Sequence, residues 1–155
     1  MERKTHVLAE AGRQDIMITR SFDLPVVLLY EAYTTPDIIE QWMGTKVLQF
    51  ELKRSGAFEF ETSDPKGQVV FTAGGVHHEL VEHQSIIRTF EMNMPGFETQ
   101  LEFLHFEAVA DASSKLTMQI IYRSPQHRER QLKLPFAFGL NMAHNRLQEI
   151  FDSLK

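Results

Sequence analysis

The 155-residue sequence contains no cysteine. Without a thiol, the chain cannot form a disulfide, use a cysteine nucleophile, or build an iron–sulfur cluster or a cysteine-based zinc site. Long apolar stretches are also missing, and the longest run, residues 26–30, is far too short to span a bilayer. No apolar segment of signal-peptide length follows the charged N-terminus. We therefore expect a cytoplasmic location and no membrane insertion.

Clustered positive charge is scarce. The formal net charge is −5, and Glu129 interrupts the closest approach to a basic cluster, within residues 123–133. Binding to nucleic acid or to an anionic membrane surface needs concentrated Lys and Arg side chains. We therefore expect no nucleic-acid partner.

Familiar catalytic motifs are missing as well. The sequence has no G-x-S-x-G elbow of a serine hydrolase, and Gly74-Gly75 lacks the continuation of a phosphate-binding loop. The densest group of potential metal ligands is His77, Glu79 and His83, but a nearly straight strand would spread them over about 20 Å. A hairpin turning at residues 82–85 would make them ordinary cross-strand partners instead, with Glu79 facing Arg88. We predict no metal and no cofactor.

Phenylalanine and methionine are what the sequence has in quantity, with 12 Phe and 7 Met against one Trp. Such side chains make a large and deformable apolar interior. The length suits one domain. We expect that domain to span residues 15–155, preceded by a flexible tail over residues 1–14.

Alternating apolar and polar residues predict about six to seven strands, at 15–22, 47–53, 58–61, 68–82, 85–94, 99–109 and 115–123. Gly74-Gly75 predicts a bulge or bend in the longest of them. Two short helices are predicted at 26–33 and 37–43, with Asp23 and Thr35 as N-caps and Gly44 as a terminator. Apolar residues from Phe136 onward recur at alternating spacings of four and three, which predicts an amphipathic helix to the C-terminus.

Strands joined by short turns must pair antiparallel. A curved antiparallel sheet with one long helix on its face is an α+β fold of two layers, and a cavity between the layers is expected. We predict an apolar ligand site there, with His77, His105 and Tyr122 as polar contacts, on the expectation that the face carrying Phe103 and His105 turns inward. The predicted lining comprises Trp42, Phe58, Phe60, His77, Phe90, Met92, Phe103, His105, Met118, Ile120, Tyr122, Phe136 and Leu140. The alternative is that these side chains simply fill the core.

Several motifs in order resemble the START-like, helix-grip superfamily, in the branch related to the C-terminal domain of the activator of heat-shock protein 90 ATPase. They are Arg20-Ser21-Phe22 with Pro25, residues 27–42 ending at Trp42, Arg54-Ser55-Gly56-Ala57-Phe58, Asp64-Pro65 with Gly67, Gly75 with Glu79-Leu80 and Ile86-Ile87, and Gly139 with Asn141-Met142 and Arg146-Leu147. Two departures are Ser55-Gly56, where relatives usually have Gly-Gly, and the lack of a tryptophan after Gly139.

The resemblance implies the helix-grip fold, but function only weakly, because that fold hosts carriers, cyclases and chaperone partners. The first hypothesis is a protein that binds an apolar, aromatic or lipid-like small molecule. The second is a stress-response protein that interacts with a chaperone ATPase. The third is a cyclase or hydrolase that uses His105 or His144 as a base, although we favour a protein without enzymatic activity. The sequence leaves open whether the protein is a monomer or a homodimer.

Overall fold

The computed structural model describes residues 2–154 as an eight-stranded sheet and four helices. The strands are β1 (His6–Leu8), β2 (Asp15–Phe22), β3 (Lys46–Phe50), β4 (Ala57–Ser63), β5 (Val69–Val81), β6 (Ser85–Met92), β7 (Gln100–Ala110) and β8 (Ser113–Ile121). The helices are α1 (Val26–Thr34), α2 (Pro36–Met43), α3 (Pro125–Leu132) and α4 (Phe136–Asp152). None of the helices in this range is long and apolar enough to cross a membrane.

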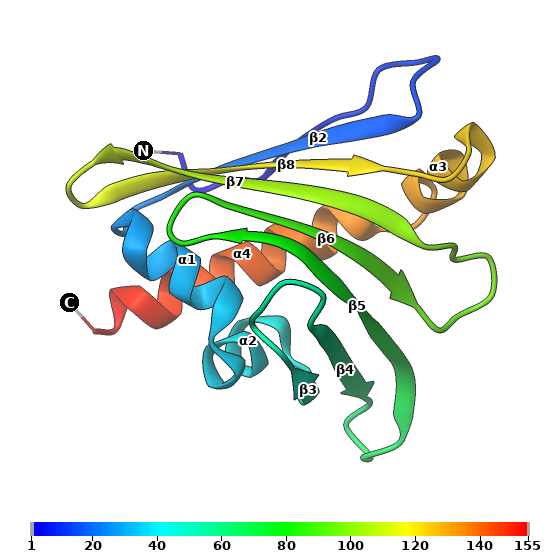
Figure 1. The fold of residues 1–155 in the computed structure, drawn as a ribbon, viewed down its shortest axis with the longest axis horizontal. Helices are drawn as coiled ribbons and strands as arrows, with labels where there is room; N and C mark the ends of the chain where they lie inside the picture. Colours follow the sequence, from blue (N-terminus) through cyan, green and yellow to red (C-terminus); the bar gives the residue numbers. More distant parts are fainter. Residues whose placement is uncertain (1, 155) are drawn as a thin grey trace.

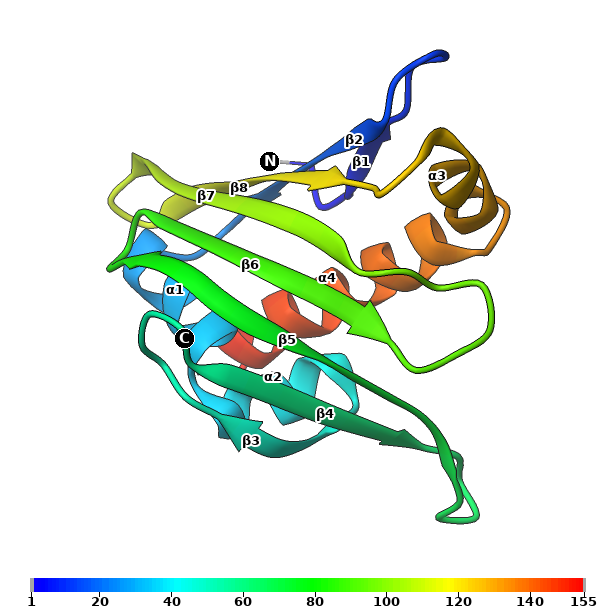
Figure 2. The same cartoon turned by 45° about the vertical axis from the view of Figure 1, so that its right-hand side comes forward.

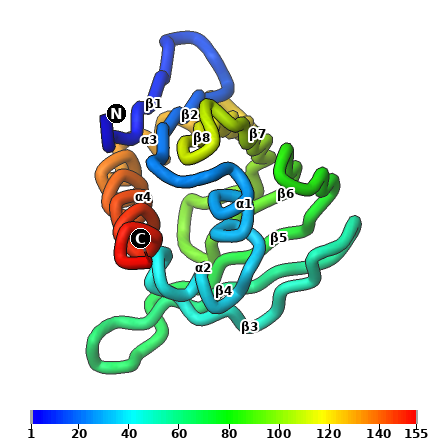
Figure 3. The backbone as a smooth tube through the Cα atoms, turned by 90° about the vertical axis from the view of Figure 1, so that its left-hand side faces the viewer, coloured from blue at the N-terminus to red at the C-terminus, as the bar shows by residue number. Residues whose placement is uncertain are grey.

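The sheet is antiparallel throughout, in the order β1-β2-β8-β7-β6-β5-β4-β3 (Figures 1 and 2). The helices α1 and α2 carry the chain from β2 to the far edge at β3. Seen end-on, the sheet forms an arc, and α4 lies on the open side of that arc (Figure 3). This confirms the predicted α+β helix-grip architecture.

The eighth strand, β1, lies in the segment predicted as a flexible tail. His6–Leu8 pairs with β2, and the backbone N–H of Thr5 donates to Asn141 Oδ1 of α4 at 2.9 Å. The prediction of a tail is therefore wrong for this part of the chain. Met1, which also belonged to it, is outside the described residues. A three-residue strand is too short to show a clear alternation of apolar and polar residues, so the sequence pattern does not predict it. It is recognised only from its pairing with β2.

The long strand β5 carries Gly74 and Gly75, but its bulge lies two residues further on. Its register with β6 shifts between His77 and Glu79, so the bulge predicted at the glycines is misplaced. A Cβ on Gly75 would come within 1.9 Å of the Thr89 carbonyl oxygen, so the close approach of two backbones requires glycine here. The bulge also ends the alternation, and His77 is buried while Glu79 is exposed.

Two helix ends test the predicted caps. Gly44 ends α2 in the left-handed conformation, with φ at 64°, as predicted. Thr35 is at the N-cap position of α2 without a side-chain hydrogen bond. The residue at the N-cap of α1 is Pro25 rather than Asp23, and the backbone N–H of Asp23 donates to the side chain of Gln148 in α4.

The inner face of β7 differs from the prediction. Gln100, Glu102, Leu104 and Phe106 are buried, whereas Phe103 is half-buried and His105 is exposed. Leu104 pairs with Met118 and Phe106 with Leu116, and both partners belong to the buried face of β8. The prediction that Phe103 and His105 face the interior is therefore wrong, because paired residues of neighbouring strands share one face of a sheet.

Candidate functional site

Three ionisable side chains lie in a row across the concave face of the sheet. His77 of β5 pairs with Arg88 of β6, and Arg88 pairs with Glu102 of β7. The row continues into apolar residues, because Glu102 pairs with Ile120 of β8. His77 is 1% exposed, Arg88 8% and Glu102 3%. A polar row is therefore enclosed in a sheet face that is otherwise largely apolar.

The centre of the row is a buried ion pair. Arg88 Nε donates to Glu102 Oε1 at 2.8 Å, and Gln100 Nε2 donates to Glu102 Oε2 at 2.7 Å. Both carboxylate oxygens therefore have a donor, which a buried charge requires. The guanidinium carbon of Arg88 lies 5.5 Å from the centre of the Phe58 ring and 5.9 Å from that of Phe90, within the range of a cation–π contact. The two Nη atoms of Arg88 have no hydrogen-bond partner within residues 2–154.

His77, at the end of the row, is held by the backbone. Its Nδ1 lies 2.9 Å from the carbonyl oxygen of Glu51, and a carbonyl can only accept, so Nδ1 carries the hydrogen. The ring centres of Phe58 and Phe50 lie 4.9 and 5.1 Å from that of His77. Burial lowers the pKa of His77, and this keeps the imidazole neutral. Its Nε2 is therefore a hydrogen-bond acceptor, for which the described chain supplies no donor.

A second buried histidine, His144 of α4, is fully paired. Its Nδ1 lies 2.7 Å from Thr5 Oγ1 and its Nε2 lies 2.9 Å from the Tyr33 hydroxyl. Burial lowers the pKa of His144 to about 3, with the nearby Arg20 charge as a smaller cause. Burial also raises the pKa of the Tyr33 hydroxyl. Because both ring nitrogens are occupied, the geometry gives His144 a structural role and no free atom to act as a base.

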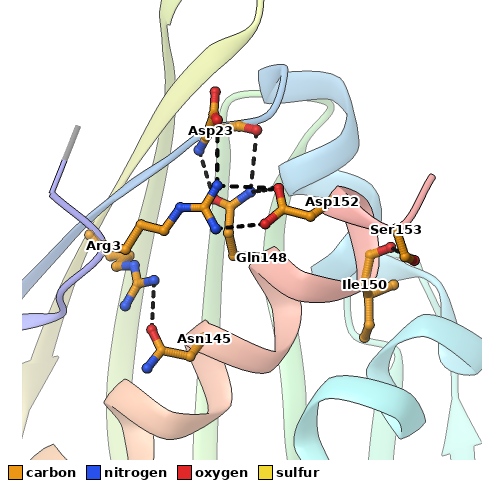
Figure 4. Close-up of polar contacts among 8 residues, drawn as sticks. Arg3, Asp23, Asn145, Gln148, Ile150, Asp152 and Ser153 are labelled. Atoms are coloured by element: carbon orange, nitrogen blue, oxygen red, sulfur yellow. Dashed lines mark hydrogen bonds and ion pairs between the residues drawn. The ribbon is translucent and has the colours of Figure 1, made fainter. Parts of the chain in front are cut away.

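The segment before β1 is bound along α4. Arg3 Nη1 donates to Asp152 Oδ2 at 2.6 Å, and Figure 4 shows this arginine reaching both Asp152 and Asp23. Beneath it, the buried Arg20 of β2 donates to Asn145 Oδ1 at 2.9 Å and has no carboxylate partner among the described residues. These contacts fix α4 against β2 and the N-terminal segment.

Most predicted lining residues do face the interior. Those that are buried or packed against the buried clusters are Trp42, Phe58, Phe60, His77, Phe90, Met118, Ile120, Tyr122, Phe136 and Leu140. Met92, half-buried, pairs with the buried Ala73, while Phe103 and His105 lie on the outer face. A hollow of about 550 Å³ borders β4, β5, β6 and the following loop, and Phe58 and Met92 are the predicted residues at its wall.

The prediction missed Arg88, Glu102 and Gln100 as site residues. Arg88 alternates with the apolar residues Ile86 and Phe90, so its inward orientation was readable from β6. Glu102 and Gln100 required the correct face of β7, which has apolar residues on both sides. The turn at residues 111–112 fixes that face, because it sets the pairing of β7 with β8.

The comparisons with known proteins agree with this architecture. The chain is similar to the solved structures of a protein from Rhodobacter sphaeroides (17% identity, 97% of this chain and 99% of that one, TM-score 0.86) and of protein Ms6760 from Mycobacterium smegmatis (17%, 94% and 94%, TM-score 0.81). A solution structure of a protein from Arthrobacter aurescens is also similar (11% identity, 96% and 91%, TM-score 0.84). At these identities the likeness concerns the fold.

No curated protein sequence matches the chain significantly. A family profile does, over residues 23–152, and its description is "Activator of Hsp90 ATPase homolog 1-like protein". The match runs from the residue after β2 to the last residue of α4, so it includes both short helices, the site row and the closing helix. The fold of this family commonly serves as a ligand-binding scaffold. The chain therefore belongs to the family of activator of Hsp90 ATPase homolog 1-like proteins.

Proposed function

We propose that the protein binds an apolar small molecule between the concave face of the sheet and α4. The phenylalanine and methionine side chains of the inner face would cover its body, and the His77–Arg88–Glu102 row would contact a polar group. Pockets of this composition, apolar with a few convergent polar groups, are typical of small-molecule sites.

One observation carries the proposal: polar atoms in the interior lack partners. Buried polar groups are almost always hydrogen-bonded. Arg88 and His77 are more than nine-tenths buried, and the Nη atoms of Arg88 and Nε2 of His77 have no partner among residues 2–154. These atoms keep slight exposure, unlike the fully buried and unpartnered Arg20 Nε and His127 Nδ1, so a bound group can reach them. His144, by contrast, has a partner for each ring nitrogen. A polar group on a ligand would satisfy them.

The test is a fluorescence titration with N-phenyl-1-naphthylamine, an apolar probe whose emission rises on transfer from water to an apolar site. We expect saturable binding, which Ile120→Phe weakens about tenfold because the larger side chain projects from the inner face of β8. Ile121→Phe, on the outer face of the same strand, is the matched control. Absence of saturable binding, or equal loss in both variants with unchanged stability, contradicts the proposal.

A second candidate is a protein partner such as a chaperone ATPase, and one surface observation favours it. Phe138 and Met142 are exposed four residues apart in the first half of α4, with Phe138 at 69%, and the exposed Leu134 lies just before the helix. A protein partner would cover these exposed apolar side chains. The proposal expects this protein to change the rate of a heat-shock ATPase, and Phe138→Ser to reduce the change. No effect at excess protein removes this candidate.

A further inference from the structure

We infer that the interior site prefers a neutral aromatic ligand bearing a hydroxyl group over the same ligand bearing a carboxylate. This inference rests on the proposed function and names its ligand class. It follows from the hydrogen-bonding roles of two side chains, from the charge balance of the row, and from the aromatic rings beside it.

His77 supplies an acceptor. The Glu51 carbonyl fixes the hydrogen on Nδ1 at 2.9 Å, so Nε2 presents a lone pair. A ligand group facing Nε2 must therefore donate a hydrogen. A hydroxyl does so, whereas a carboxylate or a carbonyl brings one lone pair against another.

Arg88 supplies donors one strand away. Its Nε is used on Glu102 at 2.8 Å, and this bond holds the guanidinium in place while both Nη atoms keep their hydrogens free of partners in the described chain. Because His77 and Arg88 are direct cross-strand partners, their side chains lie beside each other on one face. A hydroxyl is both donor and acceptor, so one such group can donate to His77 and accept from Arg88.

The charge balance disfavours an anion. Glu102 already neutralises Arg88, and His77 is neutral, so the row carries no net charge. A ligand carboxylate would give up its hydration and would add a negative charge beside the buried carboxylate of Glu102. A neutral hydroxyl group avoids both the loss of an ion's hydration and the repulsion from Glu102.

Aromatic rings lie beside these atoms. The Phe58 ring contacts both His77, at 4.9 Å between centres, and the guanidinium of Arg88, at 5.5 Å. Phe50 lies against the edge of His77, and Phe90 lies by Arg88. Offset or edge contacts with such rings favour an aromatic body over an aliphatic one of equal area.

The experiment compares three ligands with one body: 2-naphthol, naphthalene and 2-naphthoate. Each competes with N-phenyl-1-naphthylamine at pH 7, where the naphthol is neutral and the naphthoate is charged. We expect 2-naphthol to bind about tenfold more tightly than naphthalene, because Nε2 of His77 and an Nη atom of Arg88 gain a hydrogen-bond partner. We expect 2-naphthoate to bind more weakly than naphthalene.

Variants connect the preference to the row. His77→Phe should reduce the naphthol preference to about twofold or less while naphthalene still binds, because only the acceptor is lost. His78→Phe makes the same change on the adjacent exposed residue and should leave the preference intact. A double variant, Arg88→Met with Glu102→Met, removes the donors without leaving a buried charge unpaired, and should also reduce the preference.

The outcomes separate the two proposals. Equal binding of all three ligands, tightest binding of 2-naphthoate, or a naphthol preference that survives both His77→Phe and the double variant overturns the hydroxyl inference, while ligand binding itself stands. No binding of the fluorescent probe or of any naphthalene ligand overturns the proposed function, and the hydroxyl inference with it.

Discussion

Two of the buried histidines, His144 and His77, have different hydrogen-bonding surroundings. His144 has a partner for each ring nitrogen, Thr5 and Tyr33, brought by two separate segments of the chain. His77 has one partner, a backbone carbonyl, and its other nitrogen has none among the described residues. Both are almost completely inaccessible, and burial lowers the pKa of each.

The difference separates a structural histidine from a candidate binding residue. Burial alone does not distinguish them, and neither does the direction of the pKa. The two residues differ in the number of hydrogen-bonded ring nitrogens: both nitrogens of His144 are paired, whereas Nε2 of His77 has no partner among residues 2–154 and keeps slight exposure, so a ligand group can contact it.

The largest effect is expected for His144→Ala. The substitution leaves a space in the core and removes the partners of Tyr33 and Thr5, so the free energy of unfolding should fall by about 4 kcal/mol. Urea denaturation measures it. His105→Ala, on the exposed outer face, should change it by less than about 0.5 kcal/mol. Similar losses in the two variants would mean that the His144 contacts contribute little.

The second-largest effect on stability is expected for the ion pair between Arg88 and Glu102. Glu102→Leu leaves the Arg88 charge buried and unpaired, and should cost about 3 kcal/mol. Adding Arg88→Met should return most of that loss, since an apolar pair of similar volume replaces the ionic one. A denaturation series on the two single variants and the double variant tests this. A double variant less stable than Glu102→Leu would show that Arg88 stabilises the fold without its carboxylate.

The pH dependence should be smaller. The unfolded chain takes up a proton on His144 near pH 6.5, but the folded chain does so only near its pKa of about 3. The stability from this group is therefore complete above pH 6.5 and is lost on acidification, by about 2 kcal/mol at pH 5. Burial lowers the pKa of His77 and His127 as well, and these add in the same direction.

Denaturation midpoints between pH 7 and pH 5 measure that loss. In His144→Asn the midpoint should fall less over this range than in the parent protein, whereas His105→Asn should keep the parent slope. A parent midpoint that does not change with pH would show that the buried histidines are protonated in the folded state.

The smallest stability effect is expected at His77. His77→Phe loses one hydrogen bond, to the Glu51 carbonyl, and keeps an aromatic ring against Phe58, so it should cost about 1 kcal/mol or less. Its main effect should be on the ligand preference. A loss of unfolding free energy as large as that of His144→Ala would show that His77 is a structural residue, and that the two histidines do not differ in role.

Much of the fold was predictable because local patterns were unambiguous. The strand at residues 15–22 alternates cleanly, Gly44 ends a helix as expected, and the spacing from Phe136 onward marks the closing helix. The site was only partly predictable. His77 and Tyr122 do face inward, but His105 does not, because Leu101 and Phe103 make the outer face of β7 look as apolar as its inner one.

The strand–helix order, the antiparallel pairing and the large aromatic interior followed from the sequence, since these depend on short-range alternation, turn residues and composition. Which polar groups meet became clear from the three-dimensional arrangement of the strands. The pairing of β5, β6 and β7 places His77, Arg88 and Glu102 in one row, and the N-terminal segment supplies the Thr5 partner of His144 from a distance of 139 residues. Such contacts depend on the pairing register of the strands and on which distant segments of the chain come together, and no local sequence pattern encodes either.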